Sequence, residues 1–424
     1  MKKIILCLAL MAGMGMTTRA QQLPNVGFES WKGSGNAGYT YQSSKTGLTG
    51  STNGGLRQRP GEEPTEWMGS SINQKVLGSE KQQELIFKSG TNSNYYAKLV
   101  NTFVGVSSYG SNAPAFLTFG TPWVYAVTNI SNCDGGTYGG RDFSFMPDAI
   151  RGKYKKTPAS KAESSYIIAY IWNGTFTSEI ASTSTKEADK MKDDVDRAIL
   201  GSVSETGVKA PTNVTSSGKL IAWCNSAFKN TTTADADWET IEVPLNYVSA
   251  NLSETPSKMN VVICAGDYWT RDNIQDGTTL EVDDVEFVYY SELASATYDG
   301  TALAPVANGT IEVADCYDAA KLTLTSNGHG ATIEQSYSEE DAKLTITVKG
   351  EDISVNASNK HTYTIQFAKK GDVNGDKSVT IADVTALVNI ILGKADGSKV
   401  ADINGDGTTT IADVTALVNI ILGK

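Results

Sequence analysis

Apolar and polar residues alternate with a period of two along most of the chain, which is the pattern of half-buried β-strands. In the first 291 residues the strand-like runs are 166–172, 219–224, 240–245, 259–265 and 280–290, separated by segments rich in Gly, Asn and Thr. They predict a β-sandwich over residues 21–291, hereafter the body. Further alternating segments at 321–325, 342–350 and 361–367 predict a small immunoglobulin-like β-sandwich over residues 292–370, hereafter the spacer domain.

Helical periodicity interrupts the strands at two places. Residues 186–200 place Ala188, Met191, Val195 and Ile199 on one face, with Thr185 as an N-cap and Gly201 after the end, which predicts a surface helix inserted in the body. Residues 371–424, hereafter the tail, contain two short apolar stripes, each closed by a glycine: Val384, Leu387, Val388, Ile391 and Gly393, then Val414, Leu417, Val418, Ile421 and Gly423. Short helices of this kind are expected to pack on each other, so the fold class is mainly β and multidomain with a small helical tail.

The tail contains an internal sequence repeat. Residues 372–394 and 402–424 are identical at 19 of 23 positions. Each copy opens with oxygen-bearing residues at the spacing of an EF-hand calcium loop. They are Asp372, Asn374, Asp376, Ser378, Thr380 and Asp383, then Asp402, Asn404, Asp406, Thr408, Thr410 and Asp413. Gly375 and Gly405 are expected to form the sharp turn that a residue without Cβ allows. Two loops at the same phase predict two bound Ca²⁺ ions.

The loops depart from an EF-hand because the last ligand is Asp rather than Glu and because no helix precedes either loop. A pair of loop–helix units of this kind resembles the type I dockerin domain. The resemblance covers residues 372–424 and implies calcium-dependent docking to a cohesin-like protein partner. In cellulosomal dockerins small polar residues at loop positions 10 and 11 contact cohesin, whereas this chain has Ile381–Ala382 and Ile411–Ala412 there. The alternative is a calcium-stiffened C-terminal cap.

The N-terminus has the pattern of a signal peptide over residues 1–20. Lys2 and Lys3 precede an apolar core at 4–16, and Thr18-Arg19-Ala20 is a suitable cleavage site. We therefore expect an exported protein that is periplasmic, at the cell surface or secreted. No other apolar stretch is long enough to span a membrane. A net charge of −11 argues against nucleic acid and anionic membranes as partners.

Four cysteines remain after the predicted cleavage: Cys133, Cys224, Cys264 and Cys316. An even number in an exported chain allows disulfides in three pairings. Cys224 and Cys264 end strand-like runs, so they either face each other across a sheet or are buried small apolar residues. We favour the second interpretation.

The two ends of the body carry a resemblance of their own. The body opens with LPNVGFESW (23–31) and closes with TLEVDDVEFVYYS (279–291), and this pairing resembles jelly-roll carbohydrate-binding modules. The resemblance implies a jelly-roll fold in which Glu29 and Asp283, with Asp284 as second choice, meet at one structural calcium ion. FMPDAIRGKYK (145–155), DDVDRAILGSV, DWETIEVPLNY (237–247) and AGDYWTRDN also resemble a Bacteroidetes carbohydrate-metabolism domain family. That family implies a role with glycans and names no substrate.

Glycan binding needs flat aromatic faces with polar groups around them. Trp123, which follows a proline, and Tyr268–Trp269 are in loop-like contexts and are the predicted glycan-binding residues. Trp172 and Trp223 lie in apolar runs and are predicted to be core residues. No catalytic motif is present, so no catalytic residue is named. The leading hypothesis is an exported glycan-binding protein of a polysaccharide-utilisation or adhesion system. The alternatives are a glycoside hydrolase, which needs only two facing carboxylates, and a structural or adhesive surface protein.

Overall fold

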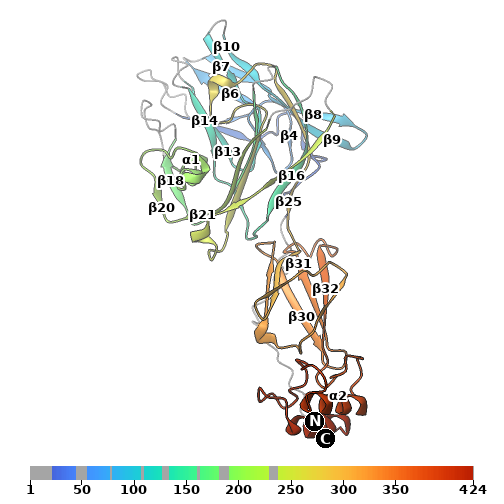
Figure 1. The fold of residues 1–424 in the computed structure, drawn as a ribbon. Coiled ribbons are helices and arrows are strands. Elements are labelled where there is room, and N and C mark those ends of the chain that lie inside the picture. The colour runs from blue at the N-terminus through green and yellow to red at the C-terminus, as the bar shows by residue number, and fades with distance from the viewer. Residues whose placement is uncertain are drawn as a thin grey trace.

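The computed structural model describes residues 22–43, 55–76, 79–106, 109–126, 133–159, 163–180, 191–228 and 237–423. The body, the spacer domain and the tail follow one another along the molecule, as Figure 1 shows. The predicted signal peptide lies outside the described residues. The chain is mainly β, as the sequence predicts, and two C-terminal helices occupy the tail. No helix within the described ranges is long and apolar enough to cross a membrane.

Two antiparallel sheets face each other in the body. The seven-stranded sheet contains β23 (Asn246–Tyr247), β21 (Lys219–Phe228), β17 (Ser165–Asn173), β24 (Lys258–Cys264), β12 (Phe116–Thr118) and β5 (Met68–Gly69), with β15 (Arg141–Asp142) paired to β24. The five-stranded sheet contains β22 (Glu239–Pro244), β16 (Ala149–Thr157), β25 (Thr279–Val288), β9 (Asn94–Val100) and β8 (Ile86–Thr91). Apolar side chains of both sheets form one core between them. The body is therefore a β-sandwich, while its jelly-roll connectivity stays a prediction.

Strand β17 explains why the sequence YIIAYIW is apolar almost without interruption. Ile167, Ala169 and Ile171 point into the sandwich core. Ile168, Tyr170 and Trp172 point to the other face of the sheet, where a second apolar cluster lies. A strand buried on both faces has no polar side for solvent, so its alternation disappears.

The second cluster is covered by an outer layer of small elements. It contains a four-stranded sheet of β14 (Asp134–Tyr138), β13 (Thr121–Tyr125), β2 (Tyr39–Gln42) and β3 (Gly55–Gln58), a three-stranded sheet of β19 (Met191–Asp193), β18 (Phe176–Glu179) and β20 (Thr215–Ser216), and helix α1 (Asp196–Leu200). Hairpins β6 (Ile72–Val76)–β7 (Ser79–Gln83) and β10 (Thr102–Val106)–β11 (Tyr109–Ala113) extend beyond it, and β1 (Trp31–Lys32) pairs with β4 (Glu63–Pro64). Short 3-10 turns lie at η2 (Ser204–Thr206), η3 (Ser249–Asn251) and η4 (Arg271–Asn273).

The helix predicted at 186–200 is confirmed only at its C-terminal end and is wrong over residues 191–195. Residues 181–190 lie outside the described residues, Met191–Asp193 form strand β19, and only Asp196–Leu200 are helical. The break is at Asp194, whose backbone φ is 60° and whose buried carboxylate accepts hydrogen bonds from the Phe176 N–H and the Trp172 indole N–H. Tertiary hydrogen bonds to a buried Asp therefore override the local helical pattern.

Cys224 and Cys264 cannot form a disulfide in this fold. Strand β17 lies between their strands, and the two side chains belong to opposite faces of the seven-stranded sheet, Cys224 in the sandwich core and Cys264 in the second cluster. Both are buried free thiols, which confirms that they are small apolar core residues, and Cys316 is also free.

The spacer domain has two sheets and a core of its own. The first sheet contains β27 (Thr301–Leu303), β26 (Leu293–Tyr298) and β29 (Leu322–Ser326). The second contains β28 (Thr310–Val313), β32 (Lys360–Phe367), β31 (Lys343–Lys349) and β30 (Thr332–Ser338). A short 3-10 turn, η5 (Ala319–Lys321), connects β28 to β29 in the chain. Both histidines of the chain lie where this domain meets the body. His329 contacts the buried Asp148 at 2.8 Å and stacks on Tyr247, and His361 lies 3.0 Å from the Ser291 hydroxyl. The joint is therefore a packed interface.

In the tail, helix α2 (Ile381–Ile391) packs against helix α3 (Ile411–Ile421). Leu387 and Leu417 are fully buried between them, and Val373, Ala401 and Ile403 complete the small core. Val384, Ile391, Val414 and Ile421 pack against this core as predicted, whereas Val388 and Val418 are only partly buried at its edge. Gly393 and Gly423 follow the helices in left-handed conformation, which is the predicted C-terminal stop.

Candidate functional site

A cavity of about 1190 Å³ opens between the outer layer of the body and its two hairpins. Its walls come from β6, β10, β11, β13 and β14, from α1, and from the segments 207–212 and 268–274. These elements are far apart in the sequence and meet only because the outer layer wraps one face of the seven-stranded sheet. A concave site of this size is large enough for a small-molecule ligand or a short stretch of polymer.

The three aromatic residues predicted to bind glycan all lie in the wall of this cavity. Two of them are more buried than the sequence suggests. Trp123 belongs to strand β13 rather than to a loop and is 3% exposed, and Tyr268 is 8% exposed. Trp269 is half-buried, and its indole N–H donates to the Asn225 side chain at 2.9 Å. The loop assignment of Trp123 is therefore wrong, and glycan binding by these three residues stays a prediction.

Sequence reasoning missed the polar and aromatic neighbours of these residues. Arg197 on α1 binds the Asp134 carboxylate through both of its terminal nitrogens, at 3.0 and 3.1 Å, and its guanidinium lies 5.9 Å from the Trp123 ring centre. Tyr109 on hairpin β10–β11 is 77% exposed and also lines the cavity. The only signal in the sequence is the glycine pair Gly135–Gly136, which faces Trp123 and Val124 in the β13–β14 pairing and leaves room beside the indole.

One buried carboxyl group supports the wall from behind. Asp196 is fully buried and accepts hydrogen bonds from the Tyr268 hydroxyl at 2.6 Å and from the Arg197 backbone N–H at 2.7 Å. Burial raises the pKa of Asp196, and the positive charge of Arg197 and these hydrogen bonds oppose that rise. Asp196 therefore fixes the orientation of Tyr268 and of the first turn of α1.

Glu29 and Asp283, predicted to share a structural calcium ion, lie near each other in the body, although the Glu29 carboxylate accepts the Tyr95 backbone N–H. Asp284, Asp283 and Glu29 all lie around Gly27, with their nearest atoms 3.4, 3.8 and 4.0 Å from the position that a Cβ would take there. Val285 donates its N–H to the Val26 carbonyl, so the first segment is joined to strand β25. Burial raises the pKa of Asp283 to about 6, and the charges of Asp284 and Glu29 add to this rise. Whether calcium binds there stays a prediction.

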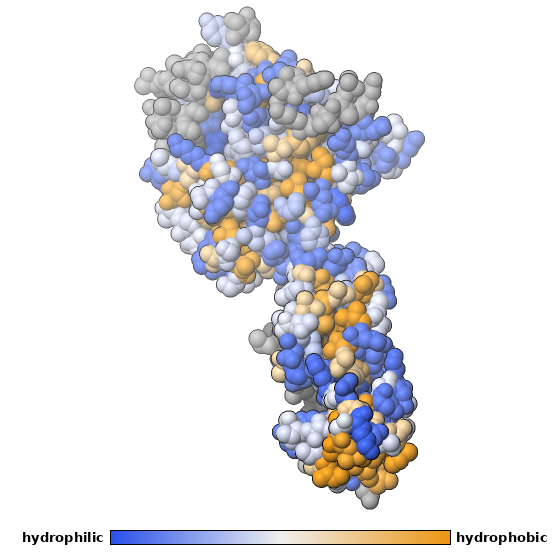
Figure 2. All heavy atoms as spheres, in the orientation of Figure 1, coloured by the Kyte–Doolittle hydropathy of each residue, from blue (hydrophilic) through white to orange (hydrophobic). Residues whose placement is uncertain are grey.

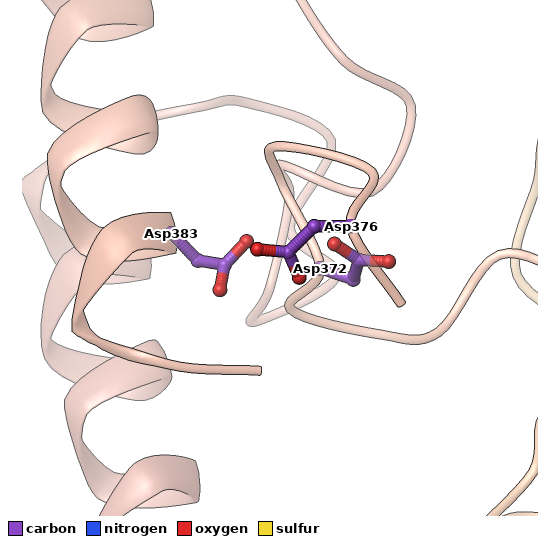
Figure 3. Close-up of side chains that lie close together, drawn as sticks. All are labelled: Asp372, Asp376 and Asp383. Carbon is purple, nitrogen blue, oxygen red and sulfur yellow. The ribbon is translucent and has the colours of Figure 1, made fainter. Parts of the chain in front are cut away.

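The first loop of the tail brings its acidic ligands together. Oxygen atoms of Asp372, Asp376 and Asp383 lie within 4.8 Å of one another, and Figure 3 shows the three carboxylates converging beside the start of α2. The Oδ1 atom of Asp372 is buried without a hydrogen-bond partner. A buried, unsatisfied carboxylate oxygen is costly unless a cation or a donor compensates it. The donor set, all oxygen, fits a hard cation such as Ca²⁺.

The last ligand of each loop is positioned by the helix that follows. The fully buried Asp383 accepts the Thr380 N–H at 2.8 Å and the Asn374 N–H at 3.1 Å, and Thr380 caps α2 by accepting from Ala382. This capping box joins the loop to the first turn of the helix. Asn374 and Ser378 brace the loop through bonds with the Asp376 N–H and carboxylate, respectively, at 2.9 Å each.

The second loop has the same hydrogen-bonded framework as the first, but its three carboxylates do not come as close together. Asp413 accepts from Ile403, Asn404 and Thr410 N–H groups at 2.7 to 3.0 Å, and Thr408 donates to Asp406. Although burial raises the pKa of Asp413, these backbone donors outweigh it, so the pKa is lowered and the ligand is anionic. Asp402, however, accepts backbone N–H groups on both oxygens. Among the described residues, only the first loop brings three carboxylates within 4.8 Å.

The left-handed turn of each loop extends further than predicted. Gly375 and Gly405 have φ of 75°, as expected for the glycines of a sharp turn. Two residues later, Lys377 and Gly407 are also left-handed, with φ of 70° and 85°. A lysine in this conformation carries steric strain that a glycine avoids. The two loops therefore differ in strain at one position.

Sequence comparison gives the tail a family. The sequence model of the dockerin type I domain matches residues 370–422, which contain both loops and both helices. Residues 370–422 are a type I dockerin domain. Domains of this type bind calcium.

Comparison of the whole chain with other known proteins adds no further family. No curated protein matches the chain. Two similar solved structures are described as a "putative glycoside hydrolase", one from Bacteroides thetaiotaomicron and one from Bacteroides vulgatus. Both are 16% identical to this chain, with TM-scores of 0.31 and 0.30. The alignments cover 60% of this chain and 72% of the first structure, and 48% of this chain and 77% of the second.

The dockerin exposes apolar side chains in matched pairs. Ile381 and Ile411 are 71% and 70% exposed, and Leu392 and Leu422 are 60% and 59% exposed. Figure 2 shows hydrophobic residues gathered at the far end of the tail. Because the small core of the dockerin is already filled by other residues, these side chains contribute little to its folding and leave an apolar surface on each repeat.

Proposed function

We propose that this chain is an exported glycan-binding protein of a polysaccharide-utilisation or adhesion system, which docks through its dockerin. The observation that supports docking is the type I dockerin at residues 370–422, with the three converging carboxylates of its first loop. The partner is a cohesin-like domain of another protein. Because loop position 10 is an exposed isoleucine in both repeats, the partner surface is expected to be apolar there.

Calcium controls docking in this proposal. One ion is held by the loop of Asp372, Asp376 and Asp383, and a second by the loop of Asp402, Asp406 and Asp413, with Asn374, Ser378, Thr380, Asn404, Thr408 and Thr410 completing the two sets. Each bound ion neutralises carboxylates that otherwise repel each other. The loops then hold both helices in place, together with the apolar surface that they display.

The cavity of the body is the glycan site. Tyr109, Tyr268 and Trp269 supply aromatic surface, and neighbouring polar side chains supply hydrogen bonds. Aromatic rings bury large area at low entropic cost, which suits the apolar faces of sugar rings. Export places this site among extracellular or periplasmic polysaccharides, and the dockerin holds it within an assembly.

One observation favours a second candidate, a glycoside hydrolase. Asp134 and Glu179 both line the cavity, and glycosidases use two carboxyl groups across the sugar. In this structure, however, Asp134 is ion-paired with Arg197, which suits a binding site better than a proton donor. The hydrolase therefore stays the alternative.

Affinity electrophoresis of the mature chain in gels containing different polysaccharides tests the proposal. We expect retardation by at least one polysaccharide and loss of retardation in the Tyr109→Ala variant. Tyr39→Ala is the matched control, because Tyr39 is also exposed but lies outside the cavity wall. Release of reducing sugar that Asp134→Asn or Glu179→Gln abolishes would favour the hydrolase instead. No retardation by any polysaccharide would contradict both.

A further inference from the structure

The charged residues of the cavity wall balance one another, although the chain as a whole carries a net charge of −11. The acidic residues in the wall are Glu80, Asp134, Glu179 and Asp272. The basic residues are Lys81, Arg197, Lys209 and Arg271. Four negative and four positive side chains leave the described wall without net charge. In a chain with 47 acidic and 36 basic residues, this cavity therefore lacks the negative charge of the rest of the molecule.

Two of these pairs are closed ion pairs. Asp134 is bound by both terminal nitrogens of Arg197, at 3.0 and 3.1 Å. Asp272 accepts a hydrogen bond from Arg271 at 2.9 Å. When a guanidinium is already paired with a carboxylate, its charge is compensated, so it binds a carboxylate or sulfate group of a ligand weakly. Both guanidinium groups of the wall therefore have their charge compensated by a neighbouring carboxylate.

A second observation points to a ligand that carries a hydrogen-bond acceptor. The indole Nε1 of Trp123 is buried and has no hydrogen-bond partner. Among the described residues that line the cavity, it is the buried side-chain donor left unsatisfied. It lies beside Gly136, also a lining residue, where a Cβ would come within 3.0 Å of it. An unsatisfied buried N–H is costly, and an oxygen atom of a ligand would compensate it.

We propose that the cavity binds an uncharged saccharide, one of whose hydroxyl or ring oxygens accepts a hydrogen bond from the Trp123 indole N–H. This inference rests on the proposed function, because it names the class of glycan that the site selects. Uncharged sugars combine apolar ring faces with hydroxyl groups, and the wall combines aromatic faces with neutral polar groups and compensated charges. An anionic glycan would find both guanidinium groups of the wall already paired, and its two lysines, Lys81 and Lys209, balanced in number by Glu80 and Glu179.

The first test compares neutral and acidic polysaccharides on the full calcium-loaded chain. The probes are galactomannan, laminarin and xylan on one side, and polygalacturonate and chondroitin sulfate on the other. We expect binding to a neutral probe, with a Kd that changes less than about twofold between 50 and 500 mM NaCl, because no counter-charge is screened. Binding to acidic probes alone, lost as salt rises and lost in Tyr109→Ala, would overturn this inference and leave the proposed function intact. Absence of binding to every probe would overturn both.

The second test removes only the indole N–H. Trp123→Phe keeps an aromatic ring in β13 but no donor, and we expect it to weaken binding of the neutral probe by about tenfold, the value of one hydrogen bond. Trp238→Phe is the matched control, because Trp238 immediately precedes β22 of the five-stranded sheet and lies outside the cavity wall. Unchanged affinity in a folded Trp123→Phe would overturn the hydrogen bond. If that variant does not fold, the probe comparison on the natural chain still decides the class of ligand.

Discussion

The body and the dockerin differ in what holds each of them together. The body buries a large apolar core between two sheets and a second cluster behind one of them, and charged groups that it also buries, such as Glu63 with Arg59 and Asp194 with Lys258, are ion-paired within the protein. The dockerin has five buried apolar residues in its core, while it also buries Asp372, Asp383 and Asp413. Apolar burial scales with domain size, so about 50 residues gain little from it. From this difference we expect that the body folds by apolar burial alone, whereas the dockerin folds only with a bound cation.

The largest effect should come from removing the last ligand of a calcium loop. Asp383→Ala or Asp413→Ala takes away a buried carboxylate that also fixes the start of a helix, so each variant should lose about one bound ion. Calcium titration calorimetry on the full chain measures the stoichiometry. Asp396→Ala is the control, since this exposed residue lies between the two repeats. An unchanged stoichiometry in both loop variants would contradict the assignment.

A core substitution in the body should act independently of calcium. Ile263→Ala removes buried apolar volume from the sandwich core and should lower the free energy of unfolding by about 2–5 kcal/mol. All seven tryptophans lie in the body, so urea unfolding followed by tryptophan fluorescence reports this region alone. Ile381→Ala in the dockerin, 71% exposed, should leave the same curve unchanged. If Ile263→Ala lowered the free energy of unfolding only after calcium is chelated, the proposed difference between the body and the dockerin would be contradicted.

The acidic group around Gly27 should give a smaller effect whose sign depends on calcium. The pKa of Asp283 is raised from 3.8 to about 6, so without metal its contribution to stability is full below pH 3.8 and is lost as pH rises through 6. Asp283→Asn should therefore stabilise the chelated body at pH 7, by about 1 kcal/mol after allowance for its partial exposure. If calcium binds there, the same variant should destabilise the calcium-loaded body. Thermal melts at pH 4.5 and pH 7, with and without EDTA, separate these results.

The smallest effect should come from the strained lysine of the first loop. Lys377 is left-handed at φ 70°, and its ion pair with Glu312 is highly exposed and contributes little. Lys377→Gly should stabilise the calcium-loaded dockerin by about 0.5–1 kcal/mol. The reciprocal Gly407→Lys should destabilise it by a similar amount, since nothing lies within 4 Å of a Cβ there and only the backbone conformation opposes the change. Thermal melting of the dockerin helices, followed by circular dichroism, compares the two variants. If both variants changed stability in the same direction, the strain explanation would be refuted.

What the sequence reveals also differs between the two regions. The calcium loops and helix stripes of the dockerin depend on spacing within 12 to 20 residues, so local pattern predicts their ligands and the buried Leu387 and Leu417. In the body, local pattern predicts strands, but not that β17 is covered on both faces, because the covering layer comes from distant segments. The helix expected at 186–200 is wrong at 191–195 for the same reason, since the hydrogen-bond partners of Asp194 lie about 20 residues earlier in the sequence.

The cavity of the body is intermediate between these two cases, because only part of it could be predicted from the sequence. Trp123, Tyr268 and Trp269 could be selected as aromatic candidates, and the structure does bring them into one wall. Their burial could not be predicted, nor could the pairing of Asp134 with Arg197, because each depends on how β13, β14 and α1 pack. Sequence therefore supplies the residue types of the site, and the outer layer of the body supplies its geometry.

Hydrogen exchange of the full chain, measured by mass spectrometry with calcium and then with EDTA, tests the central claim most directly. It reads the body and the dockerin separately in one molecule. We predict that peptides covering 372–423 are protected with calcium and exchange rapidly and completely in EDTA, while peptides of β17, β21 and β24 keep their protection in both conditions. Protection of the dockerin helices that persists in EDTA would contradict the claim that a cation holds this domain together.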